Sequence, residues 1–116
     1  MSFFSTTQVQ HGHARSSVAP HLPIDMFQQG RMLVIIAPIA GISIEDISVT
    51  VQDEVLLIRG NRKKPETLKD SDYFSQECFW GAFERPVILP VKVGVSNIVA
   101  LYKRGILRIE IPLSNQ

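Results

Sequence analysis

The chain has 116 residues, of which 45% are hydrophobic and 20% are charged, and its formal net charge is +1. This length suits a single domain with a buried core, and the composition is that of a globular protein rather than a disordered one. A near-neutral charge gives no long-range attraction toward nucleic acid or an anionic membrane, so we expect neither as a partner.

The cysteine content and the hydropathy of the chain indicate its cellular compartment. The single cysteine, Cys78, cannot form an intrachain disulfide, so nothing indicates an oxidising environment. The N-terminal residues lack the apolar segment of a secretory signal. The longest apolar run, 32–42, is about half of a membrane-spanning length and is interrupted by Pro38 and Gly41. We therefore expect a cytoplasmic protein.

The chain divides into an arm and a strand-rich domain. Residues 1–22 are polar and lack periodicity, apart from the apolar pair Phe3-Phe4, and are expected to form a flexible arm. The domain is expected to span 23–113, followed by a short tail at 114–116. The expected strands are 24–28, 31–36, 47–52, 55–59, 73–78, 83–89, 98–102 and 106–111.

The fold class follows from the spacing of these runs. The segment 47–52 alternates cleanly, with Ile47, Val49 and Val51 on one face. The charged segment 61–72 predicts a loop, and Ser43 is placed to cap a single helical turn. No window carries a convincing helical period. Seven or eight short antiparallel strands predict an all-β, immunoglobulin-like β-sandwich.

Cys78 is the one candidate nucleophile, and the sequence does not support a catalytic role for it. A nucleophilic cysteine needs a positioned base within hydrogen-bond reach. The histidines are His11, His13 and His21, and all three fall in the expected arm. We interpret Cys78 as a small residue at a packed strand position. The protein is not expected to be an enzyme.

The sequence also predicts no metal or cofactor. The spacing of the three histidines matches no structural zinc site. Paired carboxylates at 45–46 and 53–54 lie in expected turns, and the glycines are isolated rather than gathered in a phosphate-binding loop. Val55 and Leu57, however, are apolar on the face opposite Leu56 and Ile58, which indicates an interaction surface.

Four motifs carry a family resemblance. The segment ALYKRGILRIEIP (100–112) is similar to the small heat shock protein pattern A-x-x-x-x-G-[VI]-L-x-[IV]-x-[IVL]-P. VLLIRGNRK (55–63), EDISVTV (45–51) and GAFERPVILP (81–90) resemble other segments of that family, in the same order. The resemblance implies an alpha-crystallin domain that acts as an ATP-independent holdase chaperone for unfolded proteins, with no catalytic residues and no cofactor.

The bacterial and plant branch of this family implies a homodimer formed by strand exchange. By this resemblance, 73–78 would pair with 24–28 of a partner subunit, and Glu77 would pair with Arg85 across the dimer. The residues implied at this interface are Ile24, Met26, Tyr73, Phe74, Glu77, Cys78 and Arg85.

The family's C-terminal I-x-[IV] tail, which fills a groove of a neighbouring dimer, is missing here, so we expect dimers or small oligomers with the groove open to clients. The residues implied in this groove are Ile47, Val49, Val51, Ile98, Ala100 and Tyr102. Pro86 lies inside an expected strand and should face an unpaired edge or a bulge. The alternative is a co-chaperone-type β-sandwich that docks onto a larger chaperone.

Overall fold

The computed structural model describes residues 21–114, which form seven strands and three single-turn 3-10 helices. The strands are β1 (Asp25–Gln29), β2 (Met32–Pro38), β3 (Ile47–Gln52), β4 (Val55–Arg62), β5 (Gly81–Ile88), β6 (Val99–Lys103) and β7 (Ile106–Pro112). The 3-10 helices are η1 (Ile44–Asp46), η2 (Asp70–Asp72) and η3 (Val95–Asn97). Within 21–114, no helix is long and apolar enough to cross a membrane.

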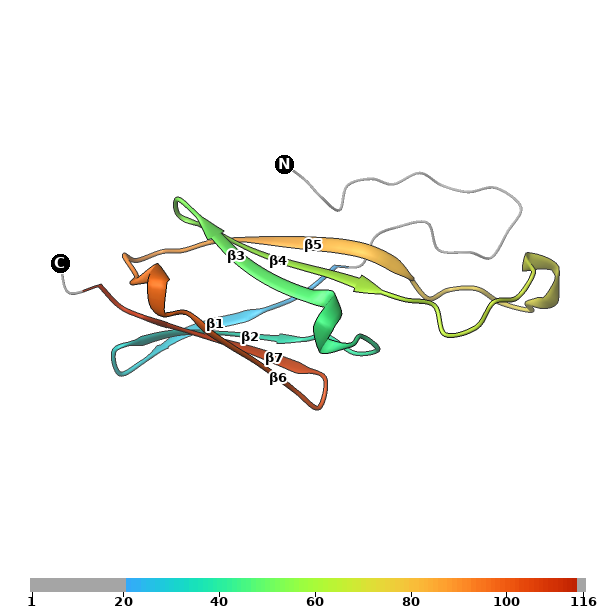
Figure 1. Cartoon of the computed structure of the whole chain (residues 1–116), viewed down its shortest axis with the longest axis horizontal. Coiled ribbons are helices and arrows are strands. Elements are labelled where there is room, and N and C mark those ends of the chain that lie inside the picture. The colour runs from blue at the N-terminus through green and yellow to red at the C-terminus, as the bar shows by residue number, and fades with distance from the viewer. Residues whose placement is uncertain (1–20, 115–116) are drawn as a thin grey trace.

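The strands form two antiparallel sheets that pack face to face, which confirms the expected β-sandwich (Figure 1). The larger sheet has the order β1-β2-β7-β6, and the smaller sheet has the order β3-β4-β5. Strands β3 and β6 lie on the viewer's side of Figure 1, whereas β1 and β5 lie behind. The four edge strands are therefore grouped in two pairs, one pair on each side of the sandwich.

Alternation along the strands builds the core between the sheets. Residues at every second position point to the same face of a strand, so one set from each central strand is buried. The larger sheet contributes residues such as Ile35 and Ile109, and the smaller sheet contributes Leu56 and Ile58, all fully buried. Their cross-strand registers, Ile35 with Ile109 and Leu56 with Val87, keep the buried rows aligned.

Two local features explain why the motifs have glycine at positions 105 and 60. The β6–β7 hairpin turns at Arg104 and Gly105, whose φ angles are 55° and 78°. Positive φ at both central residues is typical of a type I′ turn, which favours glycine. In β4, Gly60 lies opposite Phe83 of β5. A Cβ atom on Gly60 would come within 2.4 Å of the Phe83 ring, so the core leaves room for glycine only.

Three expectations differ from the structure. The segment 73–78 forms no strand and holds only a single bridge residue, Gln76, because no strand of the described chain runs beside it. Leu22, assigned to the arm, is only 5% exposed and belongs to the core. Ser43 precedes η1 as expected but does not cap it, because its hydroxyl donates to the carboxylate of Glu45 instead.

Candidate functional site

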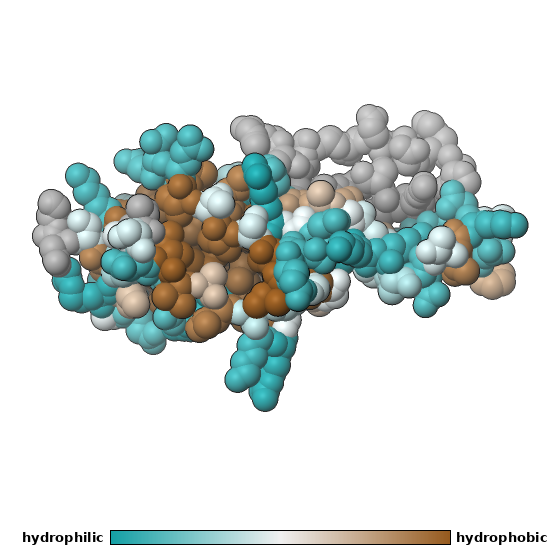
Figure 2. Space-filling view, viewed as in Figure 1, coloured by the Kyte–Doolittle hydropathy of each residue, from teal (hydrophilic) through white to brown (hydrophobic). Residues whose placement is uncertain are grey.

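The first candidate surface lies between the edge strands β3 and β6. Ile47, Val49 and Val51 of β3 are half-buried and pack against the core. Figure 2 shows apolar side chains gathered on this side of the molecule, which is the side that β3 and β6 face. Within the described part of the chain, each of these strands has a neighbour on one side only of its sheet, so the surface combines apolar side chains with edge backbone groups.

The side of this surface formed by β6 contains the other three residues expected in the groove. Ile98 and Tyr102 are half-buried against the core, and Ala100 is exposed. The Tyr102 hydroxyl donates a hydrogen bond of 2.6 Å to the carbonyl of Ile39. Tyr102 therefore also holds β6 to the segment after β2. The structure brings all six expected groove residues to this side of the sandwich.

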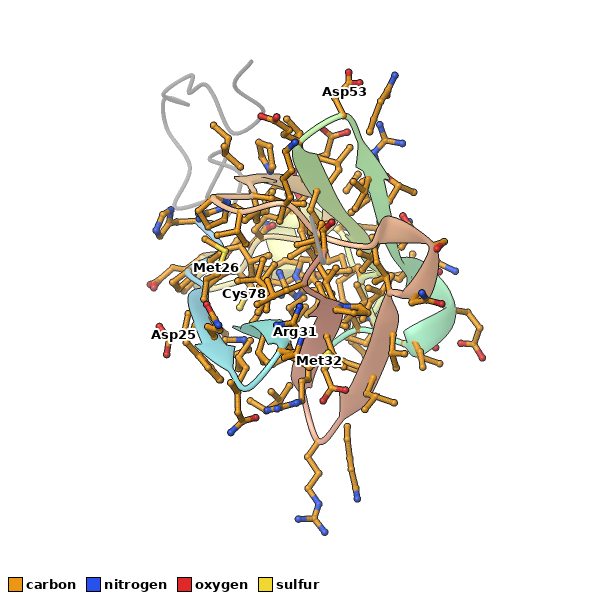
Figure 3. All side chains as sticks on the ribbon, turned by 90° about the vertical axis from the view of Figure 1, so that its left-hand side faces the viewer. Asp25, Met26, Arg31, Met32, Asp53 and Cys78 are labelled. Atoms are coloured by element: carbon orange, nitrogen blue, oxygen red, sulfur yellow. The ribbon has the colours of Figure 1, made fainter. Side chains whose placement is uncertain are left out.

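The second candidate surface is the edge formed by β1 on the other side. β1 pairs with β2 along one edge, and all five of its residues are exposed. Met26 and Phe27 are each 37% exposed on opposite faces of the strand. Figure 3 looks along the sandwich and shows Asp25 and Met26 at the margin of the larger sheet. Among residues 21–114, no strand pairs with the outer edge of β1.

The connection between β4 and β5 extends away from the sandwich (Figure 1). It contains η2 and the segment 73–78, and its own side chains enclose a hollow of about 220 Å³. Lys64 lies 4.7 Å above the Tyr73 ring, and Gln76 donates to Asp70 over 3.2 Å, so the connection has internal order. Phe74 is fully exposed. Phe74 therefore has no packing among the described residues.

Cys78 lies on this connection, and its side chain is exposed. The expected packed position is therefore not provided by its own chain. The thiol shares the hollow with Tyr73, Glu77 and Trp80, and no histidine is among the lining residues. Of the expected histidines, His11 and His13 lie outside the described residues. Within the described chain, no group of histidine, cysteine and acidic residues could hold a metal ion.

Glu77 and Arg85 do not meet within the described chain. The Glu77 carboxylate accepts a hydrogen bond of 2.9 Å from Ser75. The Arg85 guanidinium donates to the carbonyls of Leu22 and Pro86, over 2.9 Å and 3.2 Å. Pro86 lies on β5, an edge strand of the smaller sheet, which is the kind of position expected for it. The remaining interface residue, Ile24, is half-buried against the core.

The apolar surface on the outer face of the smaller sheet is larger than the sequence indicated. Val55 and Leu57 lie opposite Ile88 and Pro86 in register, and together they form an apolar patch on the outer face of the smaller sheet. Ile88 is 73% exposed. A hollow of about 660 Å³ lies over this patch. Alternation within β5 could have revealed Pro86 and Ile88, since both occupy positions opposite to the buried Phe83 and Val87.

Comparison with known proteins points to one family. Residues 25–116 match the family model described as "Hsp20/alpha crystallin family". A curated relative, small heat shock protein C2 of Rickettsia felis, is 29% identical over 86% of the chain. The chain spans 64% of the length of that relative.

Two solved structures support the likeness. Heat shock protein 16.0 of Schizosaccharomyces pombe superposes with a TM-score of 0.74 at 21% identity, covering 82% of this chain and 68% of that one. A small heat shock protein of Xylella fastidiosa gives a TM-score of 0.71 at 27% identity, covering 83% of this chain and 88% of that one. The likeness therefore extends over nearly all of the sandwich.

Proposed function

Because this chain belongs to the Hsp20/alpha-crystallin family, which supports a chaperone role, we propose that it is an ATP-independent holdase. The observation that carries the proposal is the apolar surface between the edge strands β3 and β6. Partly unfolded proteins expose apolar segments and unpaired strands. Such a segment can bury its side chains against Val49 and Val51 and add its backbone to a free edge, without any covalent chemistry.

The holdase acts by mass action in this proposal. A complex with an unfolded client lowers the concentration of the free aggregating species. No catalytic residue, metal or nucleotide takes part, and the place of action is the cytoplasm. Clients are recognised by exposed apolar segments of extended backbone rather than by a particular sequence.

The direct test is suppression of heat-induced aggregation of an unrelated protein, followed by light scattering without nucleotide. Ala100 is exposed and lies beside Ile109 in register, so its side chain points toward the space between the sheets. Ala100→Glu should introduce a charge at the groove without removing core volume, and should weaken suppression. Ala82→Glu is the matched control, since Ala82 is an exposed strand residue on the outer face of β5.

The outcomes separate the alternatives. Suppression that survives Cys78→Ser and Ala82→Glu but falls with Ala100→Glu supports the holdase. An active chain that loses suppression with Cys78→Ser would instead indicate chemistry at the thiol. No suppression, together with binding to a larger chaperone, would favour the co-chaperone-type module.

Family members form oligomers and bind unfolded clients. For this chain we propose a homodimer in which 73–78 pairs with the open edge of β1 in the partner subunit. The projecting connection, the exposed Phe74 and the open β1 edge support this arrangement. Glu77 and Arg85 would then form an ion pair between subunits, because each keeps donor or acceptor capacity beyond its contacts in the described chain.

Charge reversal tests the dimer. Glu77→Lys and Arg85→Glu should each weaken the dimer in sizing and light-scattering measurements at low concentration, and the double exchange should restore part of it. Two single variants that remain fully dimeric would contradict the pairing. We expect dimers or small oligomers at micromolar concentration, and a dominant species of twelve or more subunits would contradict that assembly.

A further inference from the structure

Arg85 joins two parts of the chain that are distant in sequence. Its Nη1 atom donates to the Leu22 carbonyl over 2.9 Å, and its Nε atom donates to the Pro86 carbonyl over 3.2 Å. The side chain is part-buried, so these hydrogen bonds are partly shielded from water, and they use a charged donor. Arg85 thus ties β5 of the smaller sheet to the segment that leads into β1 of the larger sheet.

β1 gains from such an anchor because none of its own residues is buried. All five are exposed, and β1 has a hydrogen-bonded neighbour on one side only within the described sheet. An edge strand without buried residues belongs to the least stable part of a fold and opens locally. Ahead of β1, Ile24 is half-buried against the core, and the nearest fully buried side chain is Leu22, whose carbonyl accepts the hydrogen bond from Arg85.

Pro23 transmits this anchor to the strand. The proline ring fixes its own φ angle, and it restricts the preceding residue, Leu22, to extended conformations. The chain from Leu22 to Asp25 therefore has few ways to continue once the Leu22 carbonyl is fixed. Holding that carbonyl sets where β1 begins and how its free edge is presented.

We infer that Arg85 is a positioning residue for strand exchange: it holds the receiving strand β1 in place through the Leu22 carbonyl, in addition to facing Glu77 of the partner subunit. A guanidinium has five N–H donors, and Nη2 has no partner among the described residues. One side chain can thus serve the strand and the partner at the same time. The functional meaning rests on the proposed dimer, whereas the anchoring of β1 is a property of the single chain.

The anchoring is tested by amide hydrogen exchange in a Glu77→Gln background, diluted until the chain sizes as a monomer. Arg85→Met keeps an apolar stem and removes every donor. We expect the β1 amides to exchange about tenfold faster relative to the β7 amides, because only the local opening changes. Arg59→Met is the matched control, since it removes a guanidinium that pairs with Glu84 at 3.0 Å on the outer face. It should leave that ratio within about twofold.

Two results would overturn the inference. The first is an unchanged exchange ratio in Arg85→Met. The second is an equal acceleration of β1 and β7, which a general loss of stability produces. Since the measurement is made on monomers, it stands even if the chain forms no strand-exchanged dimer.

A second measurement links the anchor to assembly. If Arg85 acted only through its contact with Glu77, Arg85→Met would add nothing once Glu77→Ala, which removes both the charge and the acceptor, is present. If it also positions β1, the dimer dissociation constant should rise by a further factor of about five or more in that background. A further change below about twofold would limit Arg85 to ion pairing and refute its positioning role.

Discussion

The contact between Gly60 and Phe83 gives the sharpest test of the core. A Cβ atom on Gly60 would lie 2.4 Å from Cζ and 2.9 Å from Cε2 of Phe83, and 2.9 Å from Cδ1 of Ile42. Phe83 is 4% exposed, so its ring has no open space into which to retreat. Gly60→Ala therefore forces either the Phe83 ring or the paired strands β4 and β5 to move.

The expected cost follows from two opposing effects. Overpacking a well-filled core costs about 1–3 kcal/mol, and the severity of this overlap places the cost near the upper end. Alanine also reduces the conformational freedom of the unfolded chain, which returns about 0.5–1 kcal/mol. We expect a net loss of about 2 kcal/mol in the free energy of unfolding, which lowers Tm by roughly 10 °C in a domain of this size.

The assay is thermal and urea unfolding at one fixed protein concentration, because assembly changes apparent stability. Gly94→Ala is the matched control: its Cβ would meet only the Pro112 carbonyl at an ordinary 3.7 Å. Phe83→Leu shortens the side chain, so it should cost less in the presence of Gly60→Ala than alone. A Gly60→Ala variant as stable as Gly94→Ala would refute the steric reasoning.

Two further predictions concern hydrogen bonds. Tyr102→Phe leaves the Ile39 carbonyl without its 2.6 Å partner and should lower the free energy of unfolding by about 1–2 kcal/mol in urea unfolding, while an unchanged value would show that water replaces the hydroxyl. The hydrogen bond from Ser43 lowers the pKa of Glu45 below its ordinary 4.5, so the ionised carboxylate stabilises the fold above that pH and the contribution is lost as pH falls through the folded-state pKa. Ser43→Ala should raise the pKa of Glu45 in an NMR titration, and an unchanged titration would assign the shift to other groups.

The sandwich could be predicted because its signals are local. Strict alternation at 47–52 identifies a strand and also the face that it buries, and the structure has β3 at Ile47–Gln52. A short interval before Val55 indicates a hairpin, and β3 indeed pairs with β4. Such features depend on residues a few positions apart, so one sequence is enough to find them.

The candidate site could be predicted only in part, for a physical reason. The segment 73–78 has strand-like composition but no strand beside it in its own described chain, so composition alone could not say whether it pairs. The contact between Arg85 and Leu22 joins residues 63 positions apart, and no local pattern reports it. The burial of Leu22 likewise depends on its place in the core cluster rather than on any local pattern in the sequence.

The edge strands lie on two opposite sides of the sandwich, β3 and β6 on one side and β1 and β5 on the other (Figure 1), and this arrangement has a consequence for binding strength. In the proposed dimer, the β1 side joins the subunits, and each subunit keeps its own β3–β6 side. A client with two apolar segments can then occupy both copies, so that the second contact forms at a high effective concentration. Such bivalent engagement can exceed the affinity of one site by about 10²–10⁴. Weak contacts at each copy would suffice to hold long unfolded chains, while short segments would dissociate readily.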